Sequence, residues 1–195
     1  MSYFFEKFYK EVLFTTNNLN FNKLEQLVQE ISLIRKKKGR FFFIGVGGSA
    51  ANCSHAVNDF RKLCNIESYS PIDNVSEITA RTNDEGWETT FSNWLKISRI
   101  NYRDAIFIFS VGGGNKKKNI SVNIINAIKL AKKNKTKVFS IVAREDGYAA
   151  QNSDISIILN ISNKKFVTPI SESFQAIIWH SLVTHPKLKI QKTKW

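Results

Sequence analysis

The sequence FFFIGVGGSA, residues 41–50, joins an apolar run directly to a cluster of glycines. Apolar residues that stop at Gly45, Gly47 and Gly48 are typical of a buried strand that enters a tight turn. Glycines let a ligand approach backbone N–H groups, and a helix beginning near Ser49 would direct the positive end of its dipole at an anion. Phosphate is the usual anion, so a nucleotide, a sugar phosphate and no ligand at all are the interpretations to compare.

A second glycine cluster repeats this pattern in IFIFSVGGGN, residues 106–115. An apolar run again ends at small residues, and a helical pattern follows it. In open parallel sheets, ligands bind beyond the carboxyl ends of the strands. A pair of such turns at one edge favours a phosphate site more strongly than a single glycine turn does. A single glycine often serves only to form a tight turn.

Strand-like and helix-like segments alternate along the chain. Apolar strands are predicted at 40–45, 104–110, 137–143 and 154–159, with a short strand at 67–69. Helices are predicted at 3–14, from an N-cap at Asn22 to about 38, and at 49–63, 87–100, 119–134 and 171–185. On the first of these, Phe4, Phe5, Phe8, Val12 and Leu13 are expected near one side. This alternation predicts an α/β fold with a parallel sheet covered by helices on both faces.

The chain is strongly basic, with 29 Lys and Arg against 16 Asp and Glu and a formal net charge of +13. Its lysines lie in separate runs without interleaved aromatic residues, which favours solvated surfaces over a nucleic-acid interface. No apolar run predicts a membrane helix, and the first residues lack the pattern of a signal peptide. Cys53 and Cys64 lie in one predicted helix, poorly placed to bond each other, so a cytoplasmic location is expected.

A dinucleotide site is the main alternative at the first turn. Gly45, Gly47 and Ala50 fit the spacing G-x-G-x-x-[GA], and Glu67 follows at about twenty residues. That motif gives no role to the second glycine cluster, and it needs a longer chain for a substrate domain. The phosphate interpretation is therefore preferred.

Histidine and carboxylate residues recur at helical spacing on two predicted helices. His55 and Asp59 are four apart and share one face, and Glu172 and His180 are eight apart, within roughly 80° around their helix. Two imidazoles and two carboxylates could form a tetrahedral zinc site. Spacing alone does not bring the two helices together, and on that ground ordinary surface or core histidines are favoured.

Four segments together resemble the phosphoheptose isomerases of the SIS (sugar isomerase) family. They are GVGGSAANCSHAVNDF (45–60), ARTNDEGWETTFS (80–92), FSVGGGN (109–115) and ISESFQAIIWH (170–180). The resemblance implies a single SIS domain at 39–195 with a five-stranded parallel sheet flanked by helices, preceded by an N-terminal helical arm at 1–38. It also implies a homotetramer with its sites at subunit contacts.

The resemblance assigns one zinc ion per subunit to four ligands, His55, Asp59, Glu172 and His180. The family pattern is His, Glu, Gln and His, so Asp59 and Glu172 depart from it while both keep an oxygen donor. The same resemblance makes Asp59 the catalytic base and His180 its partner. With these residues matched to the family, a functional site is preferred over ordinary histidines.

The resemblance also implies substrate-binding residues in three loops. They are Gly47, Gly48, Ser49, Asn83, Asp84, Ser110, Gly112, Gly113, Gly114 and Asn115. Where the family has a serine-rich loop similar to STSGNS, this chain has SVGGGN, so several phosphate-binding hydroxyls are missing. Backbone amides and the remaining polar side chains are expected to bind the phosphate instead.

The expected activity is that of an aldose–ketose isomerase. It would convert sedoheptulose 7-phosphate to D-glycero-D-manno-heptose 7-phosphate through an enediol, for bacterial surface heptose in lipopolysaccharide or capsule. The alternatives are an isomerase of another sugar phosphate and a non-catalytic SIS protein that binds sugar phosphates or regulates other proteins. The sugar phosphate and further copies of the chain are the expected partners, and neither a membrane nor a nucleic acid is expected.

Overall fold

Five parallel strands form the centre of the computed structural model, which describes residues 3–193. In chain order the strands are β1 (Phe41–Ile44), β2 (Ser68–Tyr69), β3 (Ala105–Phe109), β4 (Lys137–Val142) and β5 (Ile155–Ile158). They pair in the order β2-β1-β3-β4-β5. The predicted α/β fold with a five-stranded parallel sheet is therefore confirmed. Because β1 and β3 are neighbours, both glycine turns lie at the same edge of the sheet.

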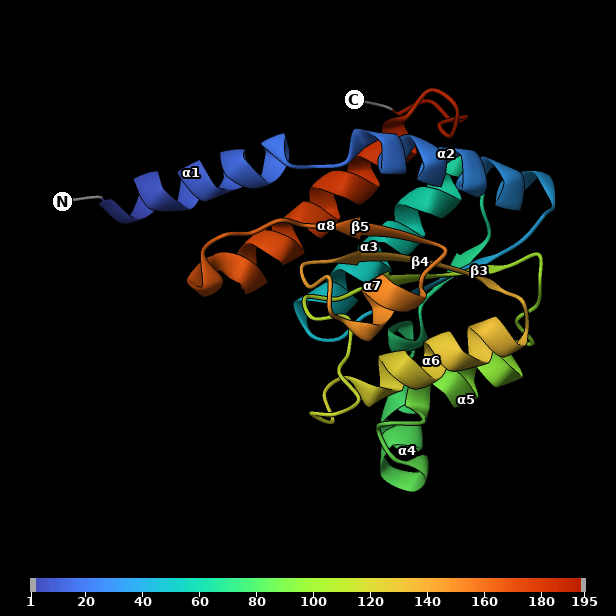
Figure 1. Cartoon of the computed structure of the whole chain (residues 1–195). Helices are drawn as coiled ribbons and strands as arrows, with labels where there is room; N and C mark the ends of the chain where they lie inside the picture. Colours follow the sequence, from blue (N-terminus) through green and yellow to red (C-terminus); the bar gives the residue numbers. More distant parts are fainter. Residues whose placement is uncertain (1–2, 194–195) are drawn as a thin grey trace.

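Helices cover both faces of this sheet (Figure 1). They are α1 (Tyr3–Asn17), α2 (Phe21–Lys36), α3 (Gly48–Cys64), α4 (Val75–Glu85), α5 (Thr90–Ile97), α6 (Val122–Lys133), α7 (Tyr148–Asn152) and α8 (Val167–Thr184), with 3-10 turns η1 (Pro71–Asp73) and η2 (Lys164–Phe166). One apolar cluster joins the sheet to α2, α3 and α8. A second joins its other face to α5, α6 and α7.

The strand β1 shows why its sequence is apolar throughout. Successive side chains point to opposite faces of a strand, so Phe41 and Phe43 pack toward α3 while Phe42 and Ile44 pack toward α5 and α6. The Phe43 ring lies 5.2 Å from that of Phe60 on α3. Burial on both faces removes the polar alternation of a half-exposed strand.

The N-terminal region contains two helices with different surroundings. On α2, Leu27, Val28, Ile31 and Ile34 are buried in the core, whereas α1 extends away from the body (Figure 1). The predicted common side of α1 is divided. Phe8 and Val12 pack against the core, but Phe4, Phe5 and Leu13 are exposed in the single chain.

Several predicted boundaries were wrong, each for a local reason. The N-cap of α2 is Asn20 and not Asn22, because the Asn20 side chain accepts a hydrogen bond from the Lys23 N–H. The helix predicted at 87–100 is only α5, Thr90–Ile97. Before it, Gly86 adopts a φ of 85° and ends α4, so the chain turns there.

Both cysteines are free, as predicted from their spacing, and both are buried. Burial raises the pKa of the Cys64 thiol to about 11, so this group stays protonated at neutral pH. Among residues 3–193, no helix is long and apolar enough to cross a membrane.

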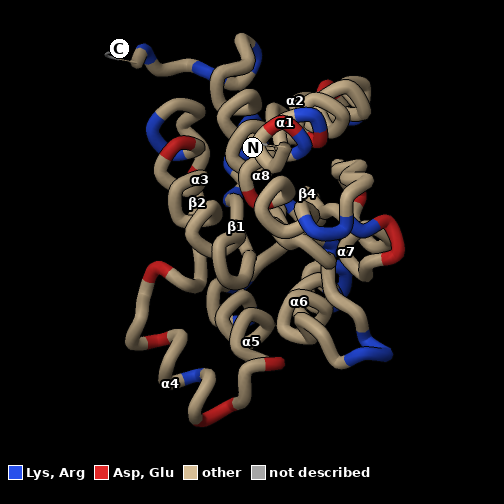
Figure 2. The backbone as a smooth tube through the Cα atoms, turned by 90° about the vertical axis from the view of Figure 1, so that its left-hand side faces the viewer, with Lys and Arg blue, Asp and Glu red and all other residues tan. Residues whose placement is uncertain are grey.

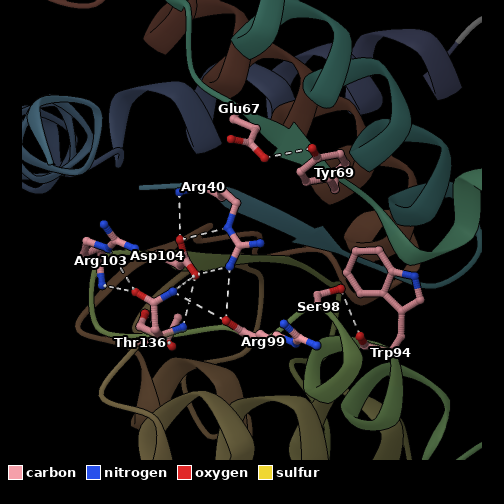
Figure 3. A network of polar contacts seen from close by, with 10 residues as sticks. Arg40, Glu67, Tyr69, Trp94, Ser98, Arg99, Arg103, Asp104 and Thr136 are labelled. Carbon is pink, nitrogen blue, oxygen red and sulfur yellow. Dashed lines mark hydrogen bonds and ion pairs between the residues drawn. The ribbon is translucent and has the colours of Figure 1, made fainter. Parts of the chain in front are cut away.

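A buried carboxylate holds the amino ends of β1 and β3 together (Figure 3). Asp104, only 2% exposed, accepts hydrogen bonds from the Arg40 backbone N–H at 2.9 Å and from the Arg40 guanidinium at 2.8 Å. The Asn101 N–H and side-chain amide both donate to Oδ2, the oxygen that also accepts from the guanidinium. This network lies at the edge of the sheet opposite the glycine turns. It therefore stabilises the sheet without occupying the turns where a ligand would bind.

Asp104→Ala should lower the free energy of unfolding by about 3 kcal/mol, because it leaves the Arg40 charge and backbone donors without an acceptor. Urea unfolding followed by circular dichroism measures this. The control is Glu30→Ala, at the partly exposed pair in which the Lys137 ammonium lies 3.6 Å from Glu30. That change should cost less than about 1 kcal/mol, and equal losses in the two variants would contradict the assigned role of Asp104.

Candidate active site

Polar contacts fix the helix α3 against α8. The Asn52 side-chain amide donates to the Glu172 carbonyl at 2.8 Å and to Gln175 Oε1 at 3.0 Å. The Gln175 amide in turn donates to Ser49 Oγ at 3.0 Å, and Gln175 is fully buried. These directional bonds set the register of the two helices, because sliding either one would leave buried polar groups unpaired.

This register brings together His55 and Asp59 from α3 and His180 from α8. Their ligand atoms lie within 4.8 Å of one another. Asp59 Oδ2 is 3.9 Å from His55 Nε2 and 3.7 Å from His180 Nε2, so the carboxylate lies between the imidazoles. The two histidine side chains are 58% and 50% exposed in the single chain, and Asp59 is 13% exposed. Three of the four ligand residues expected from the sequence thus form one cluster.

The orientation of His180 is set by its own helix and by its neighbour. His180 Nδ1 lies 2.8 Å from the Ala176 carbonyl, which can only accept, so Nδ1 donates and Nε2 is directed to Asp59. The fully buried Trp179 ring packs against His180 and lies 4.6 Å from the His55 ring. Sequence reasoning missed Trp179, although it stands directly before His180.

Glu172 lies apart from this cluster. Its carboxylate rests against Gly48, where a Cβ atom would come within 2.6 Å of Glu172 Oε2. The Glu172 carboxylate thus places a negative charge at the first glycine turn. This turn begins at Gly47, whose positive φ of 65° suits glycine. Ser49 is buried and bonded to Gln175.

The second glycine turn is held by its own polar residues. Ser110 is buried, and its hydroxyl accepts a hydrogen bond from the Gly113 N–H at 3.0 Å. Asn115 Oδ1 accepts from the Lys118 N–H, and backbone hydrogen bonds join Asn115 to Ile120. Gly113 and Gly114 both have positive φ values. The turn is thus preformed, although Ser110 and Asn115 already use polar atoms within it.

A pocket lies beside this second turn. It is lined by Gly112, Gly114, Asn115, Lys118, Ile120, Arg144, Asp146 and Gly147. The first three of these were expected at the site from the sequence, whereas Lys118 and Arg144 were not. Their signal in the sequence was a basic residue in the segment that follows each of two neighbouring strands.

Asn83 and Asp84 lie on α4 and not on a loop, which corrects the expected local structure. Both are exposed, and the Asn83 amide donates to the Asp84 carboxylate at 2.7 Å. No residue of α4 is buried, and Figures 1 and 2 both show this helix standing off the body. In one chain these residues are not gathered with the histidine cluster or the second glycine turn.

The donor set of the cluster fits zinc. Catalytic zinc sites take three protein ligands from imidazole and carboxylate groups and keep a further position for water or substrate. His55, Asp59 and His180 supply such a set on an accessible surface. The Ala176 carbonyl that binds His180 Nδ1 is the kind of outer partner that orients a ligating histidine.

No family model matches the chain, but individual curated proteins do. It is 28% identical over 148 residues to the lincomycin biosynthesis protein LmbN of Streptomyces lincolnensis, an alignment that spans 71% of this chain and only 52% of LmbN. It is 29% identical to the phosphoheptose isomerase of Haemophilus ducreyi, spanning 68% and 69% of the two chains. With that of Histophilus somni it shares 25% identity over 93% of this chain and 90% of the relative.

Solved structures share the fold. The phosphoheptose isomerase GmhA of Neisseria gonorrhoeae superimposes with a TM-score of 0.78 and 20% identity, covering 92% of this chain and 93% of that one. A phosphoheptose isomerase of Francisella tularensis gives 0.77 and 20% identity, covering 92% of each chain. The expected SIS fold is thus confirmed, and the relatives named phosphoheptose isomerase indicate an isomerase.

Removing any member of the histidine cluster should weaken zinc binding. For His55→Ala, Asp59→Ala and His180→Ala we expect a loss of at least about a hundredfold in affinity, since even the outer partners of metal ligands are worth 10- to 100-fold. Competition with a chromophoric chelator measures it.

Glu172→Gln and His185→Ala are the matched controls. The first lies at the glycine turn, and the second is an imidazole that pairs with Glu25. Both should keep the affinity of the unchanged protein. If Glu172→Gln lowered the affinity for zinc as much as His55→Ala does, Glu172 would be a zinc ligand, contrary to its position in the structure.

Proposed function

We propose that this SIS-domain protein, which resembles the phosphoheptose isomerases, converts sedoheptulose 7-phosphate to D-glycero-D-manno-heptose 7-phosphate. The observation that carries the proposal is the position of the Asp59 carboxylate between the imidazoles of His55 and His180. Such a product would supply heptose for a bacterial surface polysaccharide.

The reaction moves a proton between two neighbouring carbons and another between their oxygens. Asp59 is suited to take the proton from the carbon beside the carbonyl and to return it to the next carbon of the enediol. In the metal-free site, His180 Nε2, held by the bond from Nδ1 to Ala176, is placed to exchange a proton with the substrate oxygen; a bound zinc ion would occupy this nitrogen instead. A zinc ion bound by His55, Asp59 and His180 would supply Lewis acidity at the carbonyl oxygen.

The distance between the cluster and the glycine turns supports a site completed by another subunit. Along α3, His55 and Asp59 lie about 10 and 16 Å from the turn at Gly48, at a rise of 1.5 Å per residue. The His55 and His180 side chains are 58% and 50% exposed, so the cluster opens to the surface of the single chain. A second copy of the chain would cover it, and Asn83 and Asp84 on the projecting α4 could then reach a sugar in the partner's site.

The exposed side of α1 supports a homotetramer as the assembly. Tyr3, Phe5, Tyr9, Leu13 and Phe14 are exposed there in the single chain. Monomeric proteins rarely expose large contiguous apolar patches, and such patches commonly mark protein interfaces. We take further copies of this chain as the occupant of this surface.

Asp59→Asn and His180→Ala should each lower the turnover of sedoheptulose 7-phosphate by about 10²-fold or more, the contribution typical of a general acid or base. Proton NMR of the sugar follows the conversion, with zinc and then with a chelator. Because metal binding weakens a carboxylate as a base, chelator dependence tells whether Asp59 works with or without the metal. His185→Ala is the control and should keep full turnover. A folded protein without turnover under either condition would point to another sugar phosphate or to a binding role.

Charged substitutions on the exposed side of α1 should disrupt the assembly. Phe5→Glu with Leu13→Glu is expected to reduce the tetramer mass in size-exclusion chromatography with light scattering, because the apolar contact is lost. Ile190→Glu changes an exposed apolar residue outside α1 and should leave the mass unchanged. A monomeric unchanged protein would contradict the proposed assembly.

A further inference from the structure

The two glycine turns lie at the same edge of the sheet but differ in charge. At the first turn, the carboxylate of Glu172 lies against Gly48. At the second, the side chains of Lys118 and Arg144 line the pocket beside Gly112. Figure 2 shows basic residues on the loop that precedes α6. A phosphate group would be repelled by the acidic turn and attracted by the basic one, so the two turns are not equivalent anion sites.

The floor of the second pocket is rigid backbone. The loop after β3 and the loop after β4 are joined by hydrogen bonds from Ala143 N to Val111 O, from Tyr148 N to Gly114 O and from Ala149 N to Gly113 O, at 3.0, 2.9 and 2.8 Å. A Cβ atom placed on Gly112 would meet only Arg144 Cδ, at 3.9 Å. A ligand can therefore approach the bare backbone at Gly112, and the basic side chains stand beside it.

Arg144 is oriented within this pocket by Asp146. Its Nε and Nη2 atoms each donate to one carboxylate oxygen at 2.9 Å. These bonds leave Nη1 without a hydrogen bond to any residue in 3–193, and the Lys118 ammonium likewise makes none there. The hydrogen bond from Arg144 lowers the pKa of Asp146, and the charge of Lys118 contributes to the shift. The three charged groups together carry a net charge of +1, with free donors on both cations.

This turn offers an anion fewer hydroxyl groups than a serine-rich loop would. Val111 and Gly112 have none, and the Ser110 hydroxyl, which accepts from the Gly113 N–H, is buried. We propose that Lys118 and Arg144, beside the backbone at Gly112, bind the phosphate group of the sugar-phosphate substrate. This inference rests on the proposed function for the identity of the substrate. Binding then depends on charge, and added salt should weaken it.

The test combines direct binding with kinetics. Calorimetry measures the Kd of inorganic phosphate, and turnover of sedoheptulose 7-phosphate gives KM and kcat. Lys118→Gln and Arg144→Gln should each raise the phosphate Kd and the KM about tenfold or more, the usual worth of a hydrogen bond to a charged group, with little change in kcat. Lys117→Gln, on the same exposed hairpin but outside the pocket lining, is the matched control and should match the unchanged protein.

Asp146→Asn separates a binding role of Arg144 from a structural one. It removes the competing carboxylate, so phosphate should bind more tightly if Arg144 is a phosphate ligand. An equal loss of phosphate binding in Asp146→Asn and Arg144→Gln would mean that the pair only stabilises the loop, and the proposal would be wrong.

The remaining outcomes distinguish this proposal from the proposed function. If phosphate binding needs Lys118 and Arg144 but sedoheptulose 7-phosphate is not converted, the pocket stands and the heptose substrate is rejected. If the sugar is converted and neither substitution changes KM or the phosphate Kd, the function stands and the pocket is rejected. Absence of phosphate binding by the unchanged protein also overturns the pocket.

Discussion

The buried hydrogen bonds between α3 and α8 are the constraint on which the candidate site depends. Gln175 is enclosed between Asn52 and Ser49, so neither helix can slide without leaving polar groups unpaired in the core. This register alone decides that His180 lies beside His55 and Asp59. A slip of one helical turn would move His180 by about 5 Å and separate the imidazole from the carboxylate. The geometry of the exposed histidine cluster thus depends on the buried side-chain amide of Gln175.

The parallel pairing of β1 with β3 positions the glycine turns, and it does so independently of the contact between α3 and α8. It places two glycine turns at one edge of the sheet, while the Asp104 network holds the opposite edge. Charge then separates the two turns, because Glu172 lies at one and Lys118 and Arg144 lie at the other. The phosphate end and the reacting end of a substrate would accordingly meet different parts of the molecule, which fits a site shared between subunits.

The departures from the family pattern are coherent in physical terms. Asp59 keeps an oxygen donor between two imidazoles despite its shorter side chain. The second turn has fewer hydroxyls than a serine-rich loop, and basic side chains line the pocket beside it, which is the basis of the proposed phosphate site. Glu172 departs further, because its carboxylate packs against Gly48 and lies outside the three-residue cluster.

The sequence by itself determined the fold class, the strand positions and the presence of two glycine turns. These follow from local patterns, since apolar runs and glycine positions act over a few residues. The start of α2 was harder to place, because Asn20 and Asn22 are the same residue type and equally suited to an N-cap. Only the tertiary structure decided which distant side chains meet. It brought His180 to Asp59, as the resemblance implied, but it also separated Glu172 from them and placed Lys118 beside Arg144. Such contacts depend on packing register and strand order, which no local pattern encodes.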